Sequence, residues 1–126
     1  MWVKMKIETK KIAIIGSRTY KDVLRVYNIL DYLKTKHISF KIISGGASGV
    51  DTYAYNWCKL NDYQIEVIRP INTAIKINYL FRNIEIITKV DKIIAFWDGK
   101  SSGTKFVIDY AKARNKELEI IYDNMG

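Results

Sequence analysis

Three short loops in this sequence combine glycine with hydroxyl and charged side chains, a composition suited to holding an anion. They read GSRTY at 16–20, SGGASGVD at 44–51 and WDGKSSGT at 97–104. Glycine lets the backbone turn sharply and lets a ligand approach without a Cβ in the way. Each loop precedes a segment with helical spacing, and the free N–H groups at a helix start attract phosphate. Such loops are rich in glycine and serine in many proteins, so one of them alone is weak evidence. The prediction of a nucleotide site depends on all three loops lying at the same edge of the protein.

Four charged side chains in or near these loops have a functional and a structural interpretation. Arg18 either binds phosphate through its planar guanidinium or forms a surface ion pair. Asp51 can hold a ribose hydroxyl or polarise a water, and it can close a helix start as the acid of a Ser48-x-x-Asp51 capping box; the two roles are compatible. Arg82 either points into the site or extends from the core edge. Asp98 either forms a turn or contacts a ribose or metal. Candidates for catalytic roles are Asp51, Arg82 and Asp98.

Two standard phosphate motifs are missing from the sequence. There is no G-x-x-x-x-G-K-[ST] and no G-x-G-x-x-G, so the chain is neither a Walker-type NTPase nor a typical dinucleotide dehydrogenase. A single cysteine, Cys58, and the lack of a Cys/His cluster predict no metal site and no disulfide framework. No cofactor is firmly implied beyond a nucleotide ligand, and a Mg²⁺ ion accompanying its phosphates is left open.

The elements that must position these loops alternate along the chain. Short β-branched runs predict strands at 11–15, 40–43, 65–68, 92–96 and 118–121. Segments with helical spacing lie between them, at 20–36, 49–60, 72–88 and 104–115. Alternating strands and helices form right-handed crossovers and a parallel sheet covered on both faces. We therefore expect an α/β, Rossmann-like, three-layer doubly wound domain with a mainly parallel five-stranded sheet in the order 3-2-1-4-5.

The helical segments carry apolar residues at spacings of three and four, which predicts the face that each helix buries. In the third segment this stripe consists of Ile77, Leu80, Phe81, Ile84 and Ile87. In a sheet of this kind ligands bind beyond the carboxyl ends of the strands, where the strand order reverses. All three glycine-containing loops follow strands, so they should converge at that edge.

The length and charge of the chain bound its class. Its 126 residues predict one domain at 11–126, with 1–10 as an N-terminal extension or an extra edge strand. The formal net charge of +8 permits phosphate-bearing partners, but a solvated lysine-rich surface explains it as well. No apolar run is long enough to span a membrane and no secretory signal is recognised, so we expect a cytoplasmic protein without a membrane partner.

Over residues 11–121 the motifs resemble the SLOG superfamily, and its YspA-like branch most closely. The resemblance rests on IAIIGSRTY, ISGGASGVDTYAY, FRNIEIITKVDKIIAFWDG and SSGTKFVIDYAKARNKELEII, in that order. More distant similarity extends to DprA, the Lonely Guy phosphoribohydrolases and the molybdenum-cofactor carrier protein. The resemblance implies a Rossmann-like fold with a nucleotide-derived ligand at the strand ends. Carried over by position, it implies these ligand-binding residues: Gly16, Ser17, Arg18, Gly45, Gly46, Ala47, Gly49, Asp51, Arg82, Asn83, Asp98, Gly99, Ser102, Gly103 and Thr104.

One departure bears on enzymatic activity. Lonely Guy enzymes carry P-G-G-x-G-T-x-x-E, whose final carboxylate acts in N-glycosidic cleavage, and here Gly103-Thr104 is followed three positions later by Val107. An apolar side chain cannot transfer a proton or stabilise charge. Phosphoribohydrolase activity is therefore not expected from this position. Whether the protein is an enzyme stays open.

Three functions follow from these observations, in this order. The first is a sensor or carrier module that binds a nucleotide or nucleotide-derived small molecule. The second is a hydrolase acting on an N-glycosidic or phosphate bond of a nucleotide. The third is DprA-like binding of single-stranded nucleic acid, to which the positive charge and the tyrosines would contribute. Relatives often assemble through their helical faces, so a homo-oligomer is a further expected partner.

Overall fold

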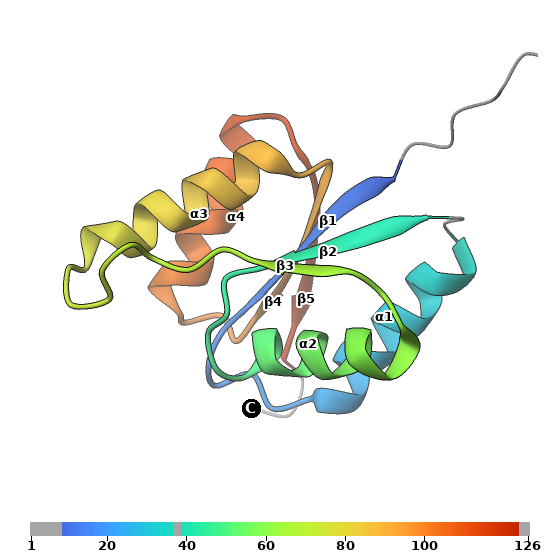
Figure 1. Ribbon diagram of the computed structural model, residues 1–126. Coiled ribbons are helices and arrows are strands. Elements are labelled where there is room, and N and C mark those ends of the chain that lie inside the picture. Colours follow the sequence, from blue (N-terminus) through green and yellow to red (C-terminus); the bar gives the residue numbers. More distant parts are fainter. Residues whose placement is uncertain (1–8, 37–38, 124–126) are drawn as a thin grey trace, which may run out of the picture.

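The computed structural model of the chain describes residues 9–36 and 39–123 and has the expected alternation of strands and helices (Figure 1). The strands are β1 (Lys10–Gly16), β2 (Phe40–Ser44), β3 (Ile65–Val67), β4 (Lys92–Trp97) and β5 (Glu117–Tyr122). The helices are α1 (Val23–Lys36), α2 (Val50–Asn61), α3 (Ile77–Lys89) and α4 (Ser102–Ala113). The predicted N-terminal edge strand falls almost wholly outside the described residues. No helix among the described residues is long and apolar enough to cross a membrane.

All four strand pairings in the sheet are parallel, and the strand order is β3-β2-β1-β4-β5, as predicted. β1 lies at the centre, with Ile14 opposite Ile94 of β4 and Ile12 opposite Ile42 of β2. The chain winds outward from β1 in both directions, so the loops that follow β1 and β4 separate toward opposite faces of the sheet. A crevice at the carboxyl ends of these two strands follows from this topology.

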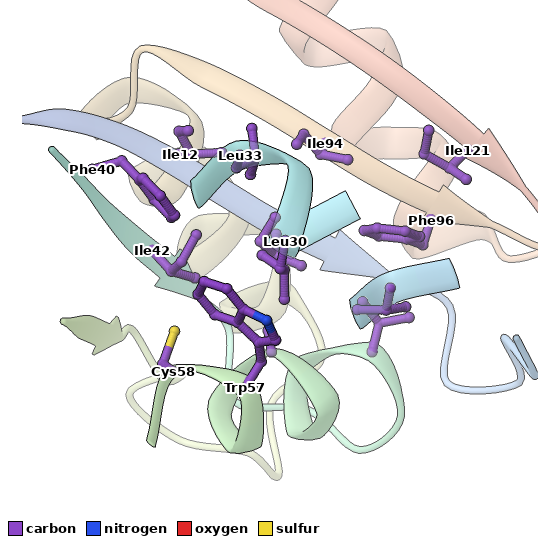
Figure 2. Close-up of a cluster of buried hydrophobic side chains, with 14 of the residues drawn as sticks. Ile12, Leu30, Leu33, Phe40, Ile42, Trp57, Cys58, Ile94, Phe96 and Ile121 are labelled. Carbon is purple, nitrogen blue, oxygen red and sulfur yellow. The ribbon is translucent and has the colours of Figure 1, made fainter. Parts of the chain in front are cut away.

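Two helices cover each face of the sheet. Alternate residues of a strand point to opposite faces, so Ile12 and Ile14 pack under α1 and α2, while Ala13 and Ile15 pack under α3 and α4. Figure 2 shows the first of these layers, with Leu30, Leu33 and Trp57 lying over the strand residues Ile12, Ile42, Ile94 and Phe96. Each layer is a continuous apolar core, which holds the strand ends in fixed relative positions.

The predicted stripe of the third helix is wrong in its first half. α3 begins at Ile77 instead of residue 72, and Ile77, Leu80 and Phe81 are 52%, 37% and 57% exposed. Figure 1 shows the start of α3 standing away from the strands.

The buried face of α3 matches the predicted stripe only in part. Asn83, Ile86 and Ile87 are buried, and of these only Ile87 belongs to the predicted stripe. A polar residue, Asn83, thus lies on the buried face, where only apolar residues were expected. The beginning of α3 therefore turns polar side chains toward the sheet edge, where the glycine-containing loops lie.

Candidate functional site

A cavity of about 520 Å³ lies at the carboxyl ends of the strands, where the three glycine-containing loops meet the first half of α3. Its volume is within the range of about 300–1,000 Å³ typical of small-molecule sites. It is lined by Ile15, Gly16, Arg18, Thr19, Gly45, Ala47, Asp51, Tyr79, Arg82, Asn83, Asp98, Lys100, Ser101, Gly103 and Thr104. The loops after β1, β2 and β4 thus converge on one space.

Most of the residues predicted from the sequence line this cavity. They are Gly16, Arg18, Gly45, Ala47, Asp51, Arg82, Asn83, Asp98, Gly103 and Thr104. The other predicted residues are Ser17, Gly46, Gly49, Gly99 and Ser102, and none of them lines it. Gly46 borders a neighbouring hollow, Ser102 is the exposed first residue of α4, and Gly99 has a φ of 82° in the loop after β4.

Ser17 and Gly49 support the site from beneath. The buried Ser17 hydroxyl accepts a hydrogen bond from the backbone N–H of Asp98 at 3.2 Å and lies 3.4 Å from the hydroxyl of Thr104. It therefore joins the loop after β1 to the loop after β4. Gly49 sits against the backbone of Arg18, because a Cβ at Gly49 would lie 2.9 Å from the Arg18 carbonyl oxygen. Gly49 therefore permits the loops after β1 and β2 to touch.

Arg82 holds the glycine loop in place. Its Nη1 donates a hydrogen bond of 2.6 Å to the carbonyl oxygen of Gly45, and its Nε donates one of 2.8 Å to the side chain of Asn83. The guanidinium also lies over the ring of Tyr79, 5.5 Å from its centroid. Arg82 does point into the site, but part of its hydrogen-bonding capacity is used to position the loop that follows β2.

Asp51 is the buried acid of the site. Its side chain is 6% exposed, and Oδ2 accepts a hydrogen bond of 2.9 Å from the N–H of Ala47. The capping box predicted for Asp51 and Ser48 is wrong, because Gly49 is the N-cap of α2 and no side chain caps that helix. Within residues 9–36 and 39–123, Oδ1 of Asp51 has no hydrogen-bond partner. Burial raises the pKa of Asp51 to about 6, opposed by the Ala47 N–H and the charge of Arg82.

Asp98 has the opposite environment. Oδ1 accepts hydrogen bonds of 2.8 Å from the N–H groups of Lys100 and Ser101, and Oδ2 accepts one from the Thr19 hydroxyl. The hydrogen bond from Thr19 is the main reason that the pKa of Asp98 is lowered to about 2. Asp98 therefore adopts the turn-forming role that was one of its two predicted interpretations.

Two exposed cations stand at the cavity, Arg18 and Lys100. No ion pair involves Arg18 in the part of the chain that the structure describes, which leaves its guanidinium open to an anion. Among the same residues no group of three or more His, Cys, Asp and Glu could hold a metal. The carboxylates of Asp51 and Asp98 both line the cavity.

Five of the lining residues were not among those predicted from the sequence. They are Ile15, Thr19, Tyr79, Lys100 and Ser101. Thr19, Lys100 and Ser101 belong to the loops that were recognised, so including every polar residue of those loops would have found them. Tyr79 lies three positions before Arg82, one turn along the same helix, and that spacing was an available signal.

The comparison with family models matches residues 10–72, half of the chain, to the family described as "YspA, cpYpsA-related SLOG family". This segment includes β1, β2 and β3 and the first two glycine-containing loops. A comparison with curated proteins finds no match.

Two solved structures of DNA processing protein A (DprA) share the fold of this chain. The structure from Streptococcus pneumoniae has a TM-score of 0.78 at 17% identity, covering 89% of this chain and 50% of the other. The structure from Helicobacter pylori, whose title describes its single-stranded DNA binding mode, has a TM-score of 0.73 at 23% identity, covering 89% and 65%. This chain thus spans less than two thirds of either protein, and at these identities the similarity establishes the fold alone.

Proposed function

Because the chain belongs to the YspA, cpYpsA-related SLOG family, we propose that it binds a nucleotide or nucleotide-derived small molecule in the main cavity and acts as a sensor or carrier of it. The single observation that carries the proposal is the convergence of three glycine-containing loops on one cavity of about 520 Å³. One such loop is common in α/β proteins, whereas three that line the same cavity at the carboxyl ends of the strands favour a ligand site.

The charges at the cavity support an anionic ligand. Arg18 and Lys100 lie at its surface, where both can reach a phosphate. Arginine binds phosphate with paired hydrogen bonds, while lysine acts as a point charge. Beneath them the buried carboxyl group of Asp51 also lines the cavity. The two cations suit the phosphate groups of a nucleotide.

Binding without turnover is favoured by the position of Val107. This side chain is fully buried in the apolar layer between the sheet and the helices α3 and α4, and it does not line the cavity. The position that carries the catalytic acid in the Lonely Guy motif is therefore part of the core here. The carboxylates that do line the cavity are Asp51 and Asp98, and Asp98 is held in its turn by three hydrogen bonds.

The proposal is tested by thermal unfolding against AMP, ADP, ATP, GTP, ADP-ribose, NAD and cyclic dinucleotides. A ligand present at about 100 times its dissociation constant stabilises the folded state by about 2.7 kcal/mol, which raises the melting temperature measurably. Arg18→Ala should weaken the binding by about 10- to 100-fold, because a charge-assisted hydrogen bond contributes about 1.5–3 kcal/mol. Arg114→Ala is the matched control, since Arg114 contacts Tyr110 and lines no part of the cavity.

The outcomes separate the three functions. A stabilising ligand that mass spectrometry recovers intact supports the sensor or carrier module. A stabilising ligand recovered in shortened form would make the protein a hydrolase. If no nucleotide shifts the transition, or if Arg18→Ala and Arg114→Ala have equal effects, the proposed small-molecule site is wrong.

A second candidate function is the binding of single-stranded DNA, favoured by the fold shared with DprA and by the net charge of +8. For single-stranded DNA, the logarithm of the binding constant falls with the logarithm of salt concentration, with a slope of about −0.7 per phosphate neutralised. A titration with a labelled oligonucleotide at several salt concentrations measures this slope. A steep slope together with no response to mononucleotides would favour single-stranded DNA binding over nucleotide binding as the function.

A further inference from the structure

A second hollow, of about 260 Å³, adjoins the main cavity at the turn formed by residues 45–47. It lies where β2 and β3 end beside the first turns of α2, and it shares only Ala47 and Asp51 with the main cavity among the residues that line the two. Its lining consists of Ser44, Gly46, Ala47, Asp51, Thr52, Tyr55, Val67 and Arg69. The proposed function of the main cavity does not account for this second space.

Arg69 supplies the positive charge of the second hollow. It is exposed, and among the described residues its hydrogen bonding consists of one long contact of 3.4 Å, from Nη1 to the carbonyl oxygen of Gly46. A Cβ at Gly46 would lie 2.9 Å from this Nη1, so glycine there lets the guanidinium lie close against the turn. An arginine side chain has five N–H donors, and most of those on Arg69 are open to a ligand.

Asp51 supplies the second, independent observation that points to a ligand. Its side chain is more than nine-tenths buried and it borders both hollows. Its Oδ1 makes no hydrogen bond of ordinary geometry within the described residues, although Gly45 and Ser44 lie close enough to the carboxyl group to lower its pKa. A buried acceptor without a donor costs free energy, and a ligand hydroxyl placed where the two hollows meet would remove that cost. The ring of Tyr55, 42% exposed, adds an apolar wall to the same hollow.

The size and chemistry of this hollow indicate what group it takes. At about 260 Å³ it is smaller than most sites for whole small molecules, which have about 300–1,000 Å³. A cation, a hydroxyl acceptor and an aromatic wall in this volume suit one phosphorylated sugar. We propose that the hollow is a second subsite for a pentose phosphate unit covalently joined to the nucleotide in the main cavity, with the phosphate on Arg69 and a sugar hydroxyl donating to Asp51.

This inference rests on the proposed nucleotide site and extends it to a ligand of two units. The second pentose phosphate can be joined through a pyrophosphate, as in ADP-ribose, or through a phosphodiester, as in the dinucleotide pApA. Both offer Arg69 a phosphate and Asp51 a hydroxyl. Because they hold the two units at different separations, comparing them identifies which linkage spans the turn at residues 45–47.

The test measures the dissociation constants of AMP, ADP-ribose and pApA for the full chain and for Arg69→Ala at one salt concentration. At least one two-unit ligand should bind about tenfold or more tightly than AMP, and Arg69→Ala should abolish this gain while leaving the AMP constant within about twofold. Arg114→Ala removes the same charge at a residue that lines neither hollow, and it should keep the gain. If Arg69→Ala alters the thermal transition, Arg69→Gln replaces it, because glutamine removes the charge and retains a polar side chain.

The possible results distinguish failure of the second subsite from failure of the nucleotide site in the main cavity. If AMP binds but neither two-unit ligand gains affinity, or if the gain survives in Arg69→Ala, the second subsite is wrong and the nucleotide site stands. If Arg114→Ala also abolishes the extra affinity for the two-unit ligand, the effect of Arg69→Ala comes from the change in overall charge. This result too would overturn the subsite. If none of the three ligands binds, the proposed function itself fails and the subsite fails with it.

Discussion

Two carboxyl groups line the same cavity, and their surroundings shift their pKa values in opposite directions. Asp51 is buried with one oxygen unpaired among the described residues, and burial raises its pKa to about 6. Asp98 accepts hydrogen bonds on both oxygens, led by the bond from Thr19, and these lower its pKa to about 2. Near neutral pH Asp98 is therefore a fixed anion, whereas Asp51 can gain a proton after a modest fall in pH.

The first prediction concerns how stability depends on Asp51. An Asp whose pKa is higher in the folded state than in the unfolded state destabilises the fold as pH rises between the two values. The shift from 3.8 to about 6 corresponds to about 3 kcal/mol lost above about pH 6, and none lost below about pH 4. We expect Asp51→Asn to match the wild type near pH 4 and to exceed it in free energy of unfolding near pH 8, measured by urea titration.

Asp98→Asn is the matched control for this prediction, because its sign is opposite. An Asp whose pKa is lowered in the folded state stabilises the fold above its unfolded pKa, and the stabilisation is lost as pH falls toward the folded value. Asp98→Asn should therefore be less stable than the wild type at neutral pH and should approach it in acid. If Asp51→Asn were less stable than the wild type at pH 8, the ionised carboxylate of Asp51 would stabilise the fold, and our prediction would be wrong.

At the scale of the loops, two glycines differ in what a side chain would meet. Gly49 begins α2 with φ 81° and ψ −124°, a conformation that other residues avoid, and a Cβ would press on the Arg18 carbonyl. Gly103 lies in the first turn of α4 with open space around it. Both glycines belong to the predicted motifs, but only at Gly49 does the backbone conformation require glycine.

The second prediction compares alanine at these two positions. Gly49→Ala should lower the free energy of unfolding by about 1–3 kcal/mol, because the residue is forced into a strained backbone conformation. Gly103→Ala should leave it unchanged or raise it by up to about 1 kcal/mol, because alanine favours a helix over glycine. Chemical denaturation of both variants checks this. Equal effects would mean that the contact between the loops after β1 and β2 is not specific to Gly49.

The third prediction concerns α4 and the position that carries the acid in Lonely Guy enzymes. Val107 is fully buried against the sheet, so Val107→Glu places an unpaired charge in the core. We expect a loss of about 3–5 kcal/mol in the free energy of unfolding and no gain of nucleotide hydrolysis. The melting temperature and a hydrolysis assay measure the two effects. A stable and active Val107→Glu would show that the side chain reaches the cavity after all, and Val107→Ala controls for lost volume alone.

At the scale of the whole molecule, one sheet joins two apolar layers. Leu30 of α1 and Ile86 of α3 lie in opposite layers, each fully buried, and the strands between them contribute side chains to both. A sheet shared in this way couples the layers, so neither is expected to unfold while the other stays folded.

The fourth prediction is that the protein unfolds in one transition. Leu30→Ala and Ile86→Ala should each lower the free energy of unfolding by about 2–5 kcal/mol, because each leaves a cavity in a packed layer. Far-ultraviolet circular dichroism and tryptophan fluorescence, to which the buried Trp57 contributes, should give coincident curves for both variants. Two separate transitions in either variant would mean that the layers unfold independently.

The sequence by itself determined the succession of elements and the sheet edge at which the glycine-containing loops meet, whereas the strand order that we expected from it was decided by the tertiary structure. These depend on local periodicity and on the handedness of the crossovers, which are properties of neighbouring residues. For the same reason it placed Arg18, Asp51 and Asp98 at one site.

Contacts between distant residues were decided by the tertiary structure alone. The first half of the apolar stripe of α3 is exposed, and the buried Asn83 lies at the site. Arg82 donates to Gly45, which is 37 positions away, and the second hollow forms because Arg69 comes to rest beside Gly46. No local pattern encodes such contacts, since packing the two layers on one sheet determines which side chains share a space.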